Sequence, residues 1–191
     1  MDTVPFIVPC RTPVGRSVTD WHENAHQLHA QLRNQYGQRY NAMYKDNGEA
    51  FIILEPQLRL SDVARAIPPS LRGMSYRLYL EQQTRWWDDK PLYVLDELGA
   101  YLHGSRHPNS EWSDYLQATE FTAYSFYLLK ITPTDYTDYN NLKTAIMWAT
   151  EDAFKYKDNS RVADYRATMR NLLPDFGWQF PASWVDAFLR T

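Results

Sequence analysis

Hydrophobic residues recur at helical spacing soon after the first prolines of the chain. They are separated by four, three and four positions, so they lie on one face of a helix. The members of this repeat are Trp21, Ala25, Leu28 and Leu32. Ser17 followed by Asp20 is typical of a capping box, and Gly37 follows the last turn. We therefore predict a helix over residues 17–36 that is anchored to the core along one face.

A β-hairpin is predicted next along the chain. Residues 40–54 contain two strand-like runs joined by Asn47-Gly48. Asn-Gly between such runs is a strong short-range signal for a hairpin. A short helix over residues 61–66 should follow, because two consecutive prolines come directly after it.

The rest of the chain has mainly helical periodicity. We expect helices near 71–87, 91–103, 110–130, 138–157, 160–172 and 181–190. Residues 1–16 contain three prolines and indicate an extended arm with a short edge strand at 6–8. No linker divides the 191 residues. The predicted fold class is mainly α (α+β), a single domain with a small hairpin in which the arm precedes a half at 17–104 and a helical half at 105–191.

Composition and charge argue against several classes of partner. The formal net charge is -3, and no run of Lys and Arg is long enough to follow a phosphate backbone, which argues against nucleic acid as a partner. No stretch of 18 apolar residues and no signal-peptide pattern occurs, so we expect no membrane partner. The chain as given is expected to be soluble and cytoplasmic, and export is compatible with a trimmed leader. The single Cys10 excludes an internal disulfide.

The most specific chemical signal lies on the first predicted helix. His22-Glu23-Asn24-Ala25-His26 has the form H-E-x-x-H. Residues four apart are neighbours on a helix, so both imidazoles can reach one metal ion. Glu23, one position further round, can reach a water on that metal. Because catalytic zinc usually takes three protein ligands, the motif predicts half of a zinc site that needs a third ligand.

Glu97 is the best candidate for this third ligand. It lies with Asp96 on the predicted 91–103 helix, which is otherwise so apolar that burying two acids is costly unless something pairs with them. A metal would pair with Glu97. Asp96 could then accept a hydrogen bond from a ligand imidazole, as carboxylates near metal sites commonly do. We expect Asp88 or Asp89 to cap this helix and the glycine at 104 to end it.

Two helices with His22-Glu23-x-x-His26 and Glu97 resemble the gluzincin class of zinc metallopeptidases. The stretch from Pro91 to Tyr101 is also similar to a motif of uncharacterised bacterial proteins with an HExxH helix. The resemblance covers residues 17–104 and implies zincin-like core helices. It departs from gluzincins at Tyr101, where an Asp often supports a ligand histidine, and Tyr101 becomes a candidate transition-state donor. Only 21 residues precede the motif, which leaves little room for the usual peptidase sheet.

Other ligand sets remain open. The metzincin pattern is excluded, because it requires Gly and His where the chain has His29 and Leu32. His29, His103, His107 and Glu120 are rival third ligands. Glu120 lies in a second aromatic helix, where it could support a ligand, mark the cleft or face solvent. Besides Tyr101, the candidate oxyanion donors are Tyr93, Tyr79, His103 and Arg72.

The sequence thus favours a zinc-dependent hydrolase acting on a peptide or protein, with Zn²⁺ on His22, His26 and Glu97 and with Glu23 as general base. A thiolate from Cys10 could fill the open metal position, although an idle cysteine is the simpler interpretation. The alternative function is a non-catalytic module that grips peptide or glycan with Trp86, Trp87, Trp112 and several tyrosines. A third hypothesis is a peptidase-like scaffold without catalysis, against which the intact Glu23 argues.

Overall fold

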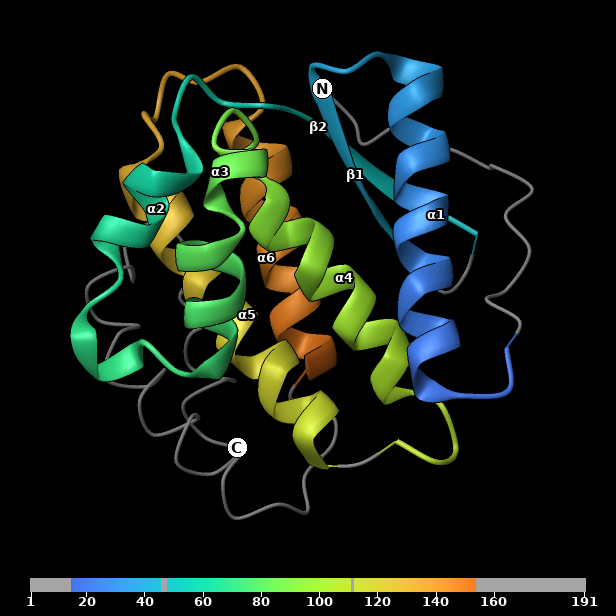
Figure 1. Ribbon diagram of the computed structural model, residues 1–191. Coiled ribbons are helices and arrows are strands. Elements are labelled where there is room, and N and C mark those ends of the chain that lie inside the picture. Colours follow the sequence, from blue (N-terminus) through green and yellow to red (C-terminus); the bar gives the residue numbers. More distant parts are fainter. Residues whose placement is uncertain (1–14, 46–47, 111, 154–191) are drawn as a thin grey trace.

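The computed structural model describes residues 15–45, 48–110 and 112–153 (Figure 1). These residues are mainly helical and include one two-stranded antiparallel sheet, which confirms the predicted fold class. The predicted arm up to residue 14, including Cys10, and the predicted helices at 160–172 and 181–190 lie outside the described residues.

The first helix, α1 (Val18–Tyr36), begins and ends as predicted. The backbone N–H of Asp20 donates to Ser17 Oγ at 3.1 Å, and Asp20 Oδ2 accepts from the Ser17 N–H at 3.0 Å. These reciprocal bonds form the capping box. The predicted apolar face is rotated, however, because the buried residues are Ala25, His29 and Leu32. His29 therefore lies in the core, beside the predicted stripe.

The hairpin pairs β1 (Tyr40–Tyr44) with β2 (Ala50–Leu54) in a register that sets Tyr40 opposite Leu54 and Tyr44 opposite Ala50. Its connecting residues 46–47 are outside the described residues, but Gly48 has a φ of 81°, a conformation that favours glycine. The hairpin contacts α1 and the central helix on one side and α6 (Tyr139–Ala153) on the other (Figure 1). The predicted hairpin is confirmed.

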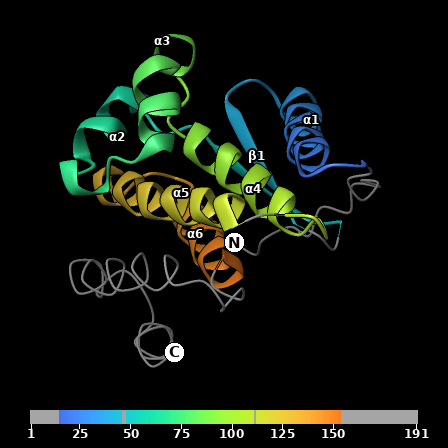
Figure 2. The ribbon, with the colours of Figure 1, turned by 60° about the horizontal axis from the view of Figure 1, so that its bottom comes forward.

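The centre of the molecule is α4 (Tyr93–Ser105), which lies between α1 and α5 (Trp112–Ile131) (Figures 1 and 2). Every residue of α4 is buried, as expected for a helix that is apolar on all sides. Asp96 and Glu97 share this burial, with exposed fractions of 3% and 2%. The two acids whose burial is expected to cost free energy are thus inside the protein.

Both ends of α4 differ from the prediction. Asp88 does not cap it, because Asp88 Oδ1 accepts from the Ser61 N–H at 2.9 Å, at the start of α2 (Leu60–Ala66). Instead, Glu55 Oε2 accepts from the backbone N–H of Leu92, the residue that precedes α4, at 3.0 Å. Gly104 does not end the helix either. It lies one residue inside, where an added Cβ would make only an ordinary van der Waals contact with the α1 residue His22 at 3.5 Å.

The helix predicted over 71–87 is divided. It consists of a π-helical segment η2 (Tyr76–Gln82) and a short helix α3 (Thr84–Trp87), and a 3₁₀ turn η1 (Pro69–Leu71) precedes it. At the junction, the Thr84 hydroxyl donates to the Leu80 carbonyl and so competes with the helical backbone bonds. This segment and α2 flank the same side of α5 (Figure 2).

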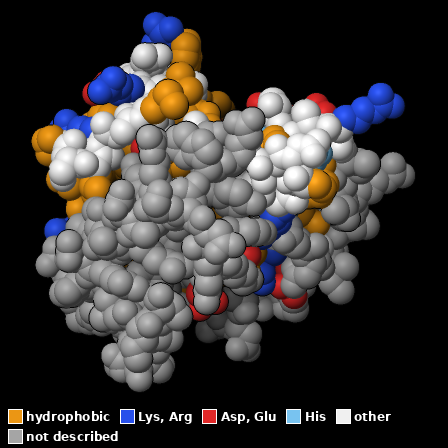
Figure 3. Space-filling view, turned by 90° about the horizontal axis from the view of Figure 1, so that it is seen from below, with side chains coloured by type: hydrophobic (Ala, Val, Ile, Leu, Met, Phe, Trp, Pro, Cys, Tyr) orange, Lys and Arg blue, Asp and Glu red, His pale blue; other side chains and the backbone are white. Residues whose placement is uncertain are grey.

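The outer surface of this segment carries the largest exposed apolar side chains among the described residues, Met74, Leu78 and Trp86. Hydrophobic side chains gather at the corresponding side of the molecule in Figure 3. No helix in the described part of the chain is long and apolar enough to cross a lipid bilayer.

Candidate metal centre

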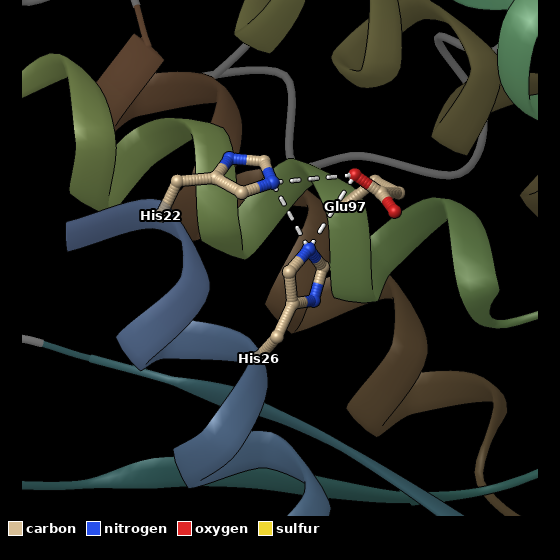
Figure 4. Close-up of side chains that lie close together, drawn as sticks. All are labelled: His22, His26 and Glu97. Atoms are coloured by element: carbon tan, nitrogen blue, oxygen red, sulfur yellow. Dashed lines mark hydrogen bonds and ion pairs between the residues drawn. The ribbon is translucent and has the colours of Figure 1, made fainter. Parts of the chain in front are cut away.

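Helices α1 and α4 bring three predicted ligands together (Figure 4). His22 Nε2 and His26 Nε2 are 3.1 Å apart. Glu97 Oε2 lies 3.8 Å from His22 Nε2 and 3.6 Å from His26 Nε2. The two histidines project from successive turns of α1, and Glu97 projects toward them from α4. The three residues that the H-E-x-x-H motif and the buried acid predicted therefore form one cluster.

The size of this triangle matches the ligand shell of a zinc ion. Tetrahedral zinc with bonds of about 2.0–2.2 Å to nitrogen and oxygen has ligand atoms roughly 3.3 Å apart. At the observed separations of 3.1, 3.6 and 3.8 Å, a single point lies about 2 Å from all three atoms. That point lies close to the plane of the three atoms, and three protein ligands leave a further position open, as catalytic zinc requires.

Glu97 Oε2 supplies an independent sign of a missing cation. It is buried and has no hydrogen-bond partner in the described structure. An unpaired carboxylate oxygen in the interior is costly, and native proteins rarely leave one without an explanation. Since the nearest groups are imidazole nitrogens on the two sides of an ion-sized gap, a metal ion fits the donor set.

Asp96 orients His26 for metal binding. Its Oδ1 lies 3.2 Å from His26 Nδ1, so that nitrogen donates to the carboxylate and Nε2 is directed at the other two ligands. Asp96 Oδ2 accepts from Arg33 Nη1 at 2.7 Å. The contact predicted between Asp96 and a ligand imidazole is therefore present.

His29 is placed behind Asp96, not beside the ligands. Its Nε2 accepts from the backbone N–H of Tyr44 at 3.0 Å, and its Nδ1 donates to Asp96 Oδ1. With both nitrogens used, His29 is a support for Asp96 and no longer a rival ligand, although it lies near enough to His26 to suggest a second cluster. Sequence reasoning missed this role for His29 and Arg33. The signal was the stripe of His22, His26, His29 and Arg33 along α1.

The pKa values of His22 and His26 are shifted in opposite directions. Burial, together with the positive charge of His26, lowers the pKa of His22 to about 3, so its Nε2 is free to coordinate. Burial alone would lower the pKa of His26 as well. The carboxylates of Asp96 and Glu97 outweigh burial and raise that pKa to about 10. Burial would raise the pKa of Asp96, but the imidazoles of His29 and His26 hold it well below its usual range.

A cleft of about 460 Å³ opens beside the three ligand atoms. One wall is α1, the other is formed by η2 and α3, and α4 contributes the remaining side. The lining residues are His22, Glu23, His26, Gln27, Ala30, Arg33, Tyr79, Gln83, Trp87, Tyr93, Asp96 and Glu97. Glu23, which follows His22 in the sequence, is exposed and lines this cleft.

The predicted oxyanion donors fall into two groups. Tyr79 and Tyr93 line the cleft. Tyr101 is buried, its ring edge lies against His22 with centroids 4.4 Å apart, and its hydroxyl hydrogen-bonds the Tyr79 hydroxyl at 2.6 Å. Tyr101 does not line the cleft itself, but its hydroxyl is bonded to that of Tyr79, which does. Burial, with the negative charge of Glu97, raises the pKa of Tyr79 to about 12 and also raises that of Tyr93, so both hydroxyls remain protonated donors.

The other candidates lie elsewhere. Glu120 Oε2 accepts from the Ser75 N–H at 3.1 Å, and Glu120 is not among the cleft residues. Arg72 donates to the Ile67 carbonyl at 3.0 Å. The described structure thus gives neither a position at this cleft.

The two remaining histidines are also away from the cleft. His107 Nδ1 accepts from the Asn109 N–H at 3.1 Å. His103 Nε2 donates to the Tyr44 carbonyl at 3.3 Å, and its ring stacks on the Tyr44 ring. Both histidines are buried in hydrogen-bonded positions, which explains them without a metal.

Comparisons of the chain with protein-family models, with curated proteins and with solved structures found no match. The assignment of this site therefore depends on its own geometry: three ligand atoms at zinc-like spacing, an unpaired buried carboxylate oxygen and an adjoining cleft.

Proposed function

We propose that the protein is a zinc-dependent hydrolase and that it acts as a metallopeptidase. The observation that carries this proposal is the convergence of His22 Nε2, His26 Nε2 and Glu97 Oε2 beside a cleft that also holds Glu23. Two imidazoles and one carboxylate are ligands that suit zinc better than calcium or magnesium, which prefer oxygen donors.

The roles of the protein groups follow from their positions. Bound zinc would act as a Lewis acid and lower the pKa of a water toward about 7. Glu23 takes the proton of the attacking water and returns it to the leaving amine. The hydroxyl of Tyr79, held by Tyr101, donates to the oxyanion that develops on the substrate carbonyl. Tyr93 is the second donor in reach of the cleft, although its hydroxyl donates to Gln83 Oε1 at 2.8 Å here.

The first experiment is metal analysis by plasma emission on protein purified without a His-tag and offered zinc. We expect about one zinc ion per chain in the wild type and in Glu23→Gln, and little in His26→Ala. Gln31→Ala is the matched control, because Gln31 is exposed on α1 and lies outside the cleft. No zinc in the wild type would overturn the proposal.

The second experiment is hydrolysis of a quenched-fluorescent peptide library by the zinc-loaded protein. Glu23→Gln should retain zinc and lose nearly all hydrolysis, since only the base is removed. Full activity in Glu23→Gln would contradict the mechanism.

A non-catalytic binding module is the second candidate function. It is favoured by Trp86, which is 60% exposed, and by Trp87, which stacks on Tyr93 at the cleft. Of the two neighbouring indoles one is thus packed and one exposed, as two adjacent tryptophans commonly are. A module of this kind would bind peptide or glycan equally well in the wild type and in Glu23→Gln, without hydrolysis by either. Trp86→Ala would then weaken binding, whereas a hydrolase that uses the cleft alone should be unaffected by this substitution.

A further inference from the structure

Arg33 has an unused hydrogen-bonding edge at the cleft. Its Nη1 donates to Asp96 Oδ2 at 2.7 Å and to Asn41 Oδ1 at 3.4 Å. Its guanidinium makes no other hydrogen bond within the described residues, so Nε and Nη2 have no partner among them. The side chain remains 16% exposed and lines the cleft. An edge formed by Nε–H and Nη2–H matches both oxygens of a carboxylate.

The position of this edge relative to the metal centre restricts what it can bind. Asp96 links the two, since its other oxygen contacts His26 Nδ1 at 3.2 Å. The backbones of His26 and Arg33 are about 10 Å apart along α1, and side chains on a helix tilt toward its N-terminus. The guanidinium therefore reaches back toward the ligands, as its bond to Asp96 requires. An extended peptide covers roughly 3.3–3.6 Å per residue. A carboxylate on Arg33 is thus one to three residues from a bond held at the metal.

The same cleft has an aromatic wall. The rings of Trp87 and Tyr93 are parallel, with an interplanar angle of 8° and centroids 4.8 Å apart. Both residues line the cleft, and the α1 side contributes the small side chain of Ala30. A stacked aromatic pair and a methyl group among the lining residues favour an apolar or aromatic side chain.

Resting on the proposed function, we propose that Arg33 binds the C-terminal carboxylate of a peptide substrate and that the wall of Trp87 and Tyr93 receives its hydrophobic side chain. The substrate class is peptides with a free carboxyl end and a hydrophobic residue near it. In the reaction, water adds to the carbonyl carbon of the scissile bond, the C–N bond breaks, and the nitrogen leaves as an amine with the proton returned by Glu23. The short C-terminal fragment is released with its carboxylate unchanged.

The test compares three blocked peptides: acetyl-Ala-Ala-Phe as the free acid, the same peptide as the C-terminal amide, and acetyl-Ala-Ala-Glu as the amide. Binding is measured by titration calorimetry with zinc-loaded Glu23→Gln, in which hydrolysis is suppressed. We expect the acid to bind at least tenfold more tightly than the Phe amide, because charged hydrogen bonds are the stronger ones. Equal affinity of acid and amide overturns the inference. If the Glu amide matches the free acid, the carboxylate comes from a side chain, and the C-terminal assignment is overturned.

Arg33→Lys in the same background removes the two-nitrogen edge and retains a positive charge beside Asp96. We expect unchanged zinc content and loss of most of the preference for the acid. Arg39→Lys is the control, because Arg39 is exposed and outside the cleft. A full preference in Arg33→Lys overturns the role of Arg33. The acid and amide comparison on unaltered Arg33 remains decisive if this variant folds poorly.

The inference and the proposed function can fail separately. If the wild type cleaves the acid and the amide at equal rates, the hydrolase stands and the carboxylate site is overturned. If the acid is preferred in binding but neither peptide is cleaved by the wild type, the carboxylate site stands and the hydrolase is overturned.

Discussion

Histidine lies beside charged side chains near both ends of α4, but the hydrogen bonding of these groups differs between the two ends. Near Ser105, His103 accepts from Arg106 Nη1 at 3.5 Å, and Arg106 is paired with Asp152. Near Tyr93, Glu97 Oε2 faces two imidazoles without a hydrogen bond. The first group is satisfied by other protein groups, whereas Glu97 Oε2 in the second has no hydrogen bond within the described residues. Burial of polar groups thus does not by itself indicate a metal site, and the unpaired atom makes the difference.

The largest expected effect is on protein stability, at the Ser105 end of α4, where Arg106 is paired with Asp152. Asp152→Ala removes the carboxylate paired with the partly buried Arg106, and the loss of unfolding free energy should approach the roughly 3 kcal/mol at the lower end of the cost of breaking a buried ion pair. Urea denaturation of the metal-free protein measures this loss. The zinc affinity of the folded protein should not change. Equal stability of Asp152→Ala and the wild type would show that this end is not held by its ion pair.

At the Tyr93 end of α4, Glu97→Gln should affect zinc affinity and the stability of the metal-free protein differently. It removes a metal ligand, so zinc affinity should fall by more than the roughly 100-fold associated with losing an outer partner. It also removes a buried carboxylate whose Oε2 has no hydrogen bond and only an ion-pair contact of 3.6 Å with His26, so the metal-free protein should be about as stable as the wild type. Competition with a zinc chelator and urea denaturation give the two numbers. A large loss of stability without zinc would mean that Glu97 is already satisfied.

Asp96→Asn tests the support of the metal centre. It keeps an acceptor for His26 but loses the negative charge, and losses of this kind reduce metal affinity about 10–100-fold. The chelator competition assay should show an intermediate dissociation constant, between those of the wild type and Glu97→Gln. An affinity as high as that of the wild type would contradict the orienting role of Asp96.

Per pH unit, the smallest effect is the change of zinc affinity with pH, and its sign follows from His26. The pKa of His26 is raised to about 10 in the folded, metal-free protein, so this imidazole stabilises the fold fully below pH 6.5 and loses that contribution as pH rises to about 10. Zinc must displace this proton, so zinc affinity should rise up to tenfold per pH unit above neutrality, about 1.4 kcal/mol. Calorimetry in two buffers of different ionisation enthalpy counts the protons released. Release of none would contradict the raised pKa.

Local features of the sequence were sufficient to predict α1, the hairpin and the closeness of His22 and His26. The capping box at Ser17, the Asn47-Gly48 pair and the H-E-x-x-H spacing all act between neighbours in the chain. Glu97 could be predicted for a different reason. An acid in an apolar helix indicates a buried partner whatever the fold.

Features that depend on the packing of distant segments were not predicted. The sequence predicts that Gly104 ends α4, but the helix continues to Ser105, at a position that packs against α1. His29 was weighed as a ligand, although the Tyr44 N–H occupies its Nε2. Directly before η2, the Ser75 N–H donates to Glu120 on the distant helix α5. None of these contacts is visible from the spacing of residues in one segment.

The hydrogen bond from Tyr44 to His29 has a consequence for the order of assembly during folding. Through Asp96 it connects the hairpin to a ligand histidine, and the third ligand is on yet another element. Because α1 alone offers only two ligands, an early helical intermediate should hold zinc weakly, and tight capture must await docking of α4 and closure of the hairpin in register. Zinc would then slow unfolding more than it accelerates folding, and the lifetime of the bound ion would equal the lifetime of this tertiary arrangement.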